Sequence, residues 1–103
     1  MYLVQILLPV YDNEGKELPQ LEFRRVSGEL AHQFRGLTAF TRAPAEGTWR
    51  EHDASHPTHD DIVVFEVMVD DLDRAWWAEY RKSLERRFRQ SVIVIRAQAM
   101  EQL

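Results

Sequence analysis

Two segments of this chain carry apolar residues at nearly every position. In residues 62–69, IVVFEVMV, Glu66 is the one polar residue, and Gln5 interrupts the otherwise apolar run of residues 2–8, YLVQILL. A strand covered on only one face alternates apolar and polar residues. We therefore expect both segments to be β-strands that are covered on both faces.

A third segment has the spacing of an amphipathic helix. Between Pro19 and about residue 35, apolar side chains recur at intervals of three and four: Phe23, Val26, Leu30 and Phe34. Such a stripe covers one side of a helix. Gly28 interrupts the helix, and we interpret it as a point of close packing between helix and sheet. Gly36 is expected to end the helix.

A second helix is predicted after residue 70. Apolar residues step by four through Leu72, Trp76, Tyr80, Leu84 and Phe88, and Asp70 or Asp71 can cap its first turn. Trp76 and Trp77 lie about 100° apart around a helix, so we expect only one of them to enter the core. The basic residues along this helix are interpreted as a solvated helix face: Arg81, Lys82, Arg86, Arg87 and Arg89.

The remaining segments complete a β-α-β-β-α-β order. Strands are expected at 2–11, 37–43, 61–69 and 91–97, with a turn at 12–15, a hairpin extension at 47–50 and a loop at 51–60. Two right-handed crossovers with interleaved strands predict a single domain, residues 1–103. The predicted fold is an α+β, ferredoxin-like sandwich, with antiparallel sheet order 4-1-3-2 and two helices on one face.

The predicted sheet has a second face that the helices do not reach. The first and third strands are central in this order, and both are apolar on both faces. Since two helices cover one face only, we expect a second copy of the chain to cover the other. The sequence therefore predicts a homodimer through the outer sheet face.

Composition narrows the classes of function. The net charge of −4 argues against a nucleic-acid partner, because phosphate contacts need a basic surface. The lack of cysteine excludes disulfides, thiolate metal sites, iron–sulfur clusters and cysteine nucleophiles. The first apolar run is too short to span a bilayer and lacks the features of a secretion signal. We expect a cytoplasmic protein with no membrane partner and no cofactor.

Three stretches carry a family resemblance: residues 34–40, FRGLTAF, residues 43–49, APAEGTW, and residues 60–67, DDIVVFEV. They resemble the F-x-G-x-T-x-[FW] … G-x-W pattern of small, uncharacterised bacterial ferredoxin-like proteins. The layout is more distantly similar to the dimeric α/β-barrel superfamily, which includes small monooxygenases, haem-degrading enzymes, chlorite dismutases and stress-responsive proteins. This resemblance implies two sheets facing each other, and it transfers no catalytic motif.

Three polar residues interrupt the outer face of the predicted sheet: Gln5, Glu66 and Arg96. If the strand registers match, they form a row across three neighbouring strands. Burying an unpaired charge is costly, so these residues are expected to pair within or between subunits. One interpretation is a hydrogen-bond network that fixes the register of a dimer. The other is a small site in which Arg96 holds an anion, Glu66 acts as a base and Gln5 assists.

Three histidines lie within the predicted loop: His52, His56 and His59. Imidazoles with nearby carboxylates suit zinc, iron or nickel. Pro57 argues against the continuous helix that would bring the three rings to one side. We therefore interpret this segment as a solvated connection and expect no metal.

The function expected from these patterns is that of a small homodimeric protein that binds a ligand or a partner. The alternative is an enzyme of the dimeric α/β-barrel type, monooxygenase- or isomerase-like, acting on a small organic substrate. An enzyme should have an enclosed pocket of several hundred Å3 with a titratable group pointing into it. A binding protein should instead show a filled core and an exposed apolar surface.

Overall fold

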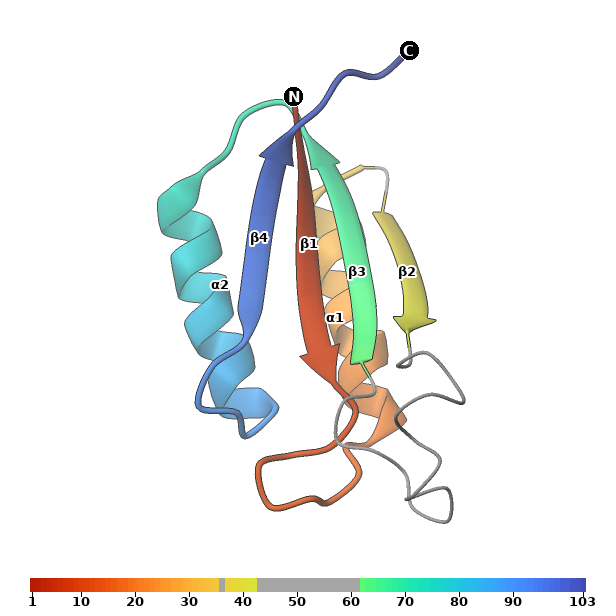
Figure 1. The fold of residues 1–103 in the computed structure, drawn as a ribbon, viewed down its shortest axis with the longest axis vertical. Helices are drawn as coiled ribbons and strands as arrows, with labels where there is room; N and C mark the ends of the chain where they lie inside the picture. Colours follow the sequence, from red (N-terminus) through yellow and green to blue (C-terminus); the bar gives the residue numbers. More distant parts are fainter. Residues whose placement is uncertain (36, 43–61) are drawn as a thin grey trace, which may run out of the picture.

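The computed structural model describes residues 1–35, 37–42 and 62–103, with only the backbone described for 37–42. Within these residues the chain forms an α+β fold (Figure 1). Its elements are β1 Tyr2–Pro9, α1 Gln20–Gln33, β2 Leu37–Arg42, β3 Ile62–Val69, α2 Arg74–Arg87 and β4 Val94–Ala99.

The strands form one antiparallel sheet in the order β2-β3-β1-β4 (Figure 1). Read from the β4 edge, this order is 4-1-3-2. The two central strands, β1 and β3, pair along their whole length, from Tyr2 opposite Val69 to Pro9 opposite Ile62. These are the two strands with apolar side chains on both faces, so the most apolar strands lie at the centre of the sheet.

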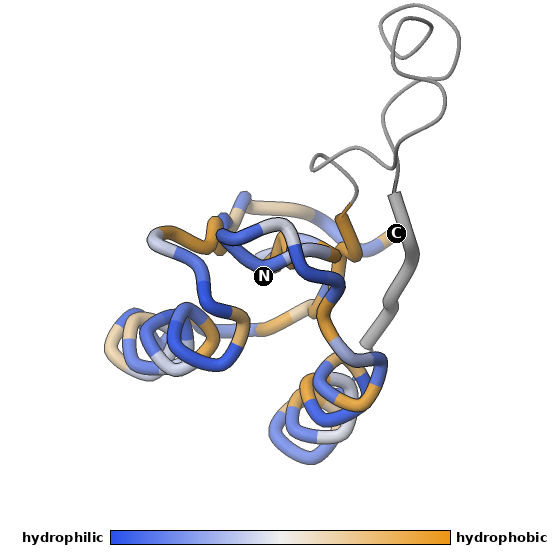
Figure 2. The backbone as a smooth tube through the Cα atoms, turned by 90° about the horizontal axis from the view of Figure 1, so that it is seen from below, coloured by the Kyte–Doolittle hydropathy of each residue, from blue (hydrophilic) through white to orange (hydrophobic). Residues whose placement is uncertain are grey.

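Both helices lie on the same face of the sheet (Figure 2). Alternate residues of the central strands point toward the helices, as the two-residue period of a strand requires. Val4, Ile6 and Leu8 of β1 and Phe65 and Val67 of β3 are buried there. They pack against residues of the two helices and the segment after α2: Val26, Leu30, Trp77, Leu84, Phe88 and Ile93. The core beneath the helices is therefore formed by residues of one subunit alone.

The cap of α2 differs from the predicted one. Neither Asp70 nor Asp71 caps this helix. The carboxylate of Asp73 accepts a hydrogen bond of 3.1 Å from the backbone N–H of Trp76. An N-cap side chain reaches the N–H groups two or three residues ahead, and the helix begins at Arg74, so only Asp73 has the required spacing.

The apolar stripe of α2 also needs correction. Trp77, which lies outside the predicted run of residues spaced by four, is the buried tryptophan, with 6% of its surface exposed. Trp76 is only partly buried. Each step of four residues turns about 40° too far around a helix of about 100° per residue, so such a run leaves the core-facing side. The core instead takes Trp77 with Leu84 and Phe88.

The fold prediction is corrected in its details. β1 ends at Pro9 rather than residue 11, β2 ends at Arg42, and β4 covers 94–99 rather than 91–97. Helix α1 begins one residue after Pro19, which is its N-cap, and ends at Gln33. Gly36 and residues 43–61, which include the expected hairpin extension at 47–50, lie outside the described residues. We therefore describe the fold as α+β with the strand order above and do not retain the ferredoxin-like sandwich as its assignment.

The turn after β1 is confirmed. Gly15 has a φ of 83°, a backbone conformation that favours glycine. The buried carboxylate of Asp12 accepts hydrogen bonds of 2.9 Å from the N–H groups of Glu14 and Lys16. Asp12 also lies 3.6 Å from a guanidinium nitrogen of Arg89, so the turn is linked to the residues that follow α2.

Close packing at Gly28 is wrong. Gly28 is exposed in the interior of α1, and a Cβ built there would meet no atom within 4 Å. The glycine therefore makes no close approach in the folded chain. It destabilises the helix, because a glycine loses more conformational entropy on folding than other residues do.

Gly28→Ala should stabilise the protein by about 0.5–1 kcal/mol, because alanine restricts the unfolded chain and clashes with nothing in the folded one. Urea unfolding followed by circular dichroism measures the change. Ala31→Gly, at another exposed position of the same helix, is the matched control and should destabilise by a similar amount. A destabilising Gly28→Ala would show that this surface of α1 is covered in solution.

Candidate functional site: a polar row on the helix-free sheet face

The predicted polar row is present on the sheet face that carries no helix. Gln5 lies opposite Glu66 on β3 and opposite Arg96 on β4. The side-chain amide of Gln5 donates a hydrogen bond of 2.7 Å to Glu66 Oε2. Its carbonyl oxygen accepts one of 2.8 Å from Arg96 Nε. The amide thus connects a carboxylate and a guanidinium on the strands to either side of it.

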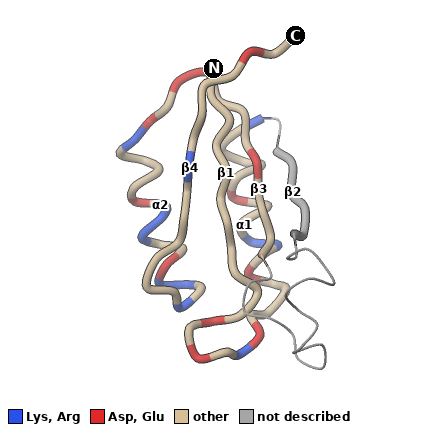
Figure 3. The backbone as a smooth tube through the Cα atoms, in the orientation of Figure 1, with Lys and Arg blue, Asp and Glu red and all other residues tan. Residues whose placement is uncertain are grey.

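The row has opposite charges at its two ends. Glu66 is the one acidic residue of β3, Arg96 is the one basic residue of β4, and β1 between them has no charged residue (Figure 3). Adjacent strands are about 4.8 Å apart, so the two charges are separated by roughly 10 Å. The pair is therefore a fixed dipole lying across the sheet, held in place by Gln5.

Apolar side chains flank the row on both sides. In one direction along the strands Leu7 lies opposite Val64 and Val94, and in the other Leu3 lies opposite Met68. Val64 is buried, the side chains of Leu3, Leu7 and Met68 are half-buried, and Val94 is 47% exposed. Apart from Gln98, which lies opposite Leu3 on β4, the described side chains that flank the row are apolar. We call this surface the open face below.

The other candidate residues, His52, His56 and His59, lie outside the described residues. Among the residues that are described, no three His, Cys, Asp or Glu side chains are grouped so that they could hold a metal ion. Nor does any helix among these residues have the length and apolar character needed to cross a membrane.

A cleft lies on the other side of the sheet, between sheet and helices, where the enzyme alternative places its pocket. It lies between the first half of α2 and strands β1 and β4, and its volume is about 310 Å3. Its roof is formed by residues of α2 spaced by three, four and seven: Arg74, Trp77, Ala78 and Arg81. Its floor comes from alternate residues of the two strands: Tyr2, Val4, Ile95 and Ala97. Leu72 and Arg96 complete the lining.

Small residues at facing positions explain why this space is not filled. Ala78 of α2 and Ala97 of β4 lie where larger side chains would close the gap between helix and sheet. Leu84, in the second half of α2, and Phe88, directly after the helix, belong to the same buried cluster as Ile93. The spacing Arg74-x-x-Trp77-Ala78-x-x-Arg81 was the available signal, since residues at these intervals share one side of a helix. The sequence interpretation had placed Arg81 on a solvated face instead.

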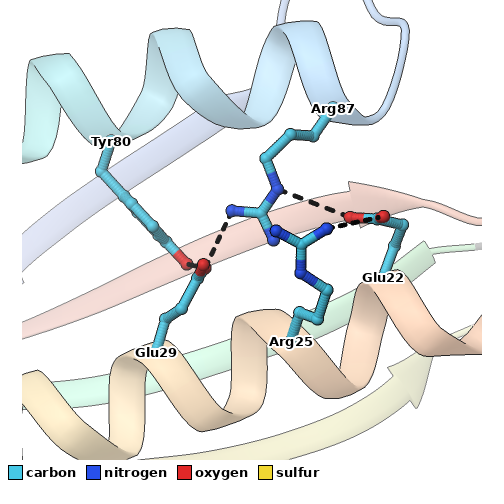
Figure 4. Close-up of polar contacts among 5 residues, drawn as sticks. All are labelled: Glu22, Arg25, Glu29, Tyr80 and Arg87. Carbon is cyan, nitrogen blue, oxygen red and sulfur yellow. Dashed lines mark hydrogen bonds and ion pairs between the residues drawn. The ribbon is translucent and has the colours of Figure 1, made fainter.

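A separate polar cluster joins the two helices (Figure 4). Glu29 of α1 accepts hydrogen bonds from the hydroxyl of Tyr80 at 2.9 Å and from Arg87 Nη1 at 2.8 Å. Arg87 Nε also lies 3.4 Å from Glu22, which pairs with Arg25. The buried Nη2 of Arg87 has no hydrogen-bond partner among the described residues. Because nearly all the polar groups here pair across the two helices, we interpret the cluster as a structural bridge.

Aromatic rings extend this bridge toward the other end of the helices. Phe34, directly after α1, stacks on Trp77 with ring centres 5.1 Å apart. Trp76 contacts Phe34 edge to face at 5.1 Å and stacks on Tyr80 at 5.0 Å. The stacked rings fix the position of Trp77, and with it the apolar wall of the cleft.

The chain matches no protein-family model, no curated protein and no solved structure. The resemblance to small bacterial ferredoxin-like proteins and to dimeric α/β barrels therefore stays a prediction. The open face and the α2 cleft are the features of this chain that bear on its function.

The interhelical bridge predicts a loss of stability at alkaline pH. Burial and the neighbouring Glu29 carboxylate raise the pKa of Tyr80 above its usual value. The folded state therefore holds this proton more tightly than the unfolded state does. Its contribution to stability is complete below the pKa of a free tyrosine, about 10, and is lost as the pH rises above it.

The free energy of unfolding should fall between pH 9 and 12 more steeply for the native sequence than for Tyr80→Phe, which has no phenolic proton. Urea unfolding across this pH range measures both slopes. Glu29→Gln, which keeps the phenol and removes the carboxylate, should give an intermediate slope. Equal slopes for the native protein and Tyr80→Phe would contradict the proposed burial of this group.

Proposed function

We propose that this chain is a small homodimeric binding protein whose two subunits meet through their open faces. The observation that carries the proposal is the polar row with opposite charges at its ends, set between apolar rows on a face without helices. A row of this kind is complementary to a second copy of itself.

Symmetry explains this complementarity. Most homodimers are related by a two-fold axis, so the same patch serves both subunits. If the axis runs along the strands, between the two sheets, it exchanges the ends of the row. Glu66 of one subunit then faces Arg96 of the other, and each Gln5 lies near the axis. An axis along the row itself would oppose like charges and is disfavoured.

Burial favours the same arrangement. Face-to-face sheets lie about 10 Å apart, a distance that the side chains of two facing rows can bridge. Leu3, Leu7, Met68 and Val94 would lose their remaining exposure to water, which is the main favourable term in association. The charges would stay paired through Gln5 and across the interface, so the cost of burying them is offset.

The alternative of a dimeric-barrel enzyme has less support. The α2 cleft has the size expected for a small substrate, but apart from Tyr2 the ionisable side chains that line it are arginines. Arginine stays protonated at physiological pH and cannot act as a general base. Glu66, the predicted base, lies on the opposite face of the sheet, hydrogen-bonded to Gln5.

A charge-swap experiment tests the dimer. Glu66→Arg alone and Arg96→Glu alone place like charges opposite each other and should weaken dimerisation by about tenfold or more. The double variant Glu66→Arg/Arg96→Glu restores opposite charges at every contact and should recover most of the affinity. Sedimentation equilibrium measures the dissociation constants. Arg24→Glu, an equal charge change on exposed α1, is the control and should leave dimerisation unchanged.

Met68→Lys tests the apolar part of the same surface. A lysine at this half-buried position remains compatible with the folded subunit but inserts an unpaired charge into the interface, so we expect monomers. Val64 is less suitable, because only 2% of its surface is exposed and a lysine there would disturb the subunit itself. A native protein that sediments as a monomer, or a Met68→Lys variant that dimerises as tightly as the native chain, would refute the proposal.

A further inference from the structure

The α2 cleft has lining residues of two kinds, which lie where one ligand can contact both. Its walls are apolar and include Trp77, Val4 and Ile95, while Arg74 and Arg81 lie one turn to either side of Ala78 on its roof. No carboxylate is among the described residues that line it. The cleft is therefore a concave apolar site whose fixed charges are all positive.

The two arginines differ in how they are held. Arg81 Nη1 donates a hydrogen bond of 3.0 Å to Glu85 Oε2. Glu85 is itself held by the backbone N–H of Ile93 at 3.0 Å. This contact fixes the guanidinium of Arg81 and leaves its other N–H groups available. Arg74 makes no hydrogen bond or ion pair within the part of the chain that the structure describes, so no neighbouring side chain there occupies its N–H groups.

Guanidinium groups and apolar walls together define the chemistry of a ligand. The planar fork of arginine matches the two oxygens of a carboxylate. Apolar walls favour a ligand whose remainder is a ring or a short branched chain, since burying that surface supplies the affinity. Ligand pockets usually have volumes of about 300 to 1,000 Å3, so this cleft suits a molecule at the small end of that range.

We propose that the α2 cleft binds a small organic carboxylate with an apolar body, whose carboxylate contacts Arg74 and Arg81 and whose body lies against Trp77 and the facing strand residues. The inference deepens the proposed function, because it names the class of ligand for a binding protein. It does not depend on the dimer, since Arg74, Trp77 and Arg81 all lie on the helical side of the sheet.

The test uses the full chain and three probes. Benzoate has the ring and the carboxylate, benzamide has the same shape without the charge, and inorganic phosphate has the charge without the apolar body. Amide chemical shifts in 1H–15N spectra report binding and show where it occurs. We expect saturable benzoate shifts confined to residues 72–81 and 95–97, with benzamide and phosphate each binding about tenfold more weakly.

Variants connect the affinity to particular side chains. Arg74→Gln and Arg81→Gln should each weaken benzoate binding about fivefold or more, since each removes a charged hydrogen-bond donor. Ala78→Leu, which fills the cleft with a good helix former, should abolish binding while the fold is kept. Arg86→Gln, an equal charge change on the exposed side of α2 and outside the cleft, should have no effect.

Several results would overturn the inference. Equal affinities for benzoate and benzamide would mean an apolar hole without charge recognition, and equal affinities for benzoate and phosphate would mean a surface anion site. An Arg86→Gln variant that loses as much affinity as Arg74→Gln would point to diffuse charge, and no saturable shift at all would leave no site. Masses measured on the same samples separate the two proposals, because benzoate binding by a monomer would refute only the dimer.

Discussion

The central strands β1 and β3 are apolar on both faces, while both helices of the chain lie on one face. That imbalance is the constraint on which the rest depends. The covered face carries the core, in which Val4, Ile6, Leu8 and the facing helix residues are shielded from water. The open face keeps half-buried leucines and a methionine at its surface, arranged around one row of polar side chains. Exposing this apolar surface to water costs free energy, and its row of opposite charges is complementary to itself, which is why we propose a second copy of the chain as its cover.

Strand alternation lets the same two strands serve both features. In β1, Tyr2 and Val4 line the cleft beneath α2, whereas Leu3 and Gln5 belong to the open face. In β4, Ile95 and Ala97 face the cleft, and Arg96 between them belongs to the polar row. The α2 cleft and the open face are therefore separated by one thickness of sheet. β4 thus contributes both to the lining of the cleft and to one end of the row.

Much of this arrangement follows from local sequence pattern, and the rest depends on tertiary geometry. The polar row was predictable, because three polar residues interrupt apolar strands and the antiparallel register brings them together. The cap at Asp73 was missed because the spacing of apolar residues does not define the first residue of a helix. The burial of Trp77 was missed because residues spaced by four turn gradually away from the core-facing side of a helix. The lining of the cleft could not be predicted, because Ala78 and Ala97, the two alanines that leave it open, come together only in the folded chain. Gly28 was misread because an exposed glycine and a tightly packed one look the same in sequence.

The central claim is that a second copy covers the open face, and intersubunit distances test it most directly. Isotope-filtered NOE spectra of a mixture of labelled and unlabelled chains detect only contacts between different copies. The account predicts intersubunit NOEs from the methyl groups of Leu3, Leu7 and Met68, and none from the core residue Leu84. Open-face methyl groups that show no intersubunit NOE and are instead broadened by a water-soluble paramagnetic agent would contradict it.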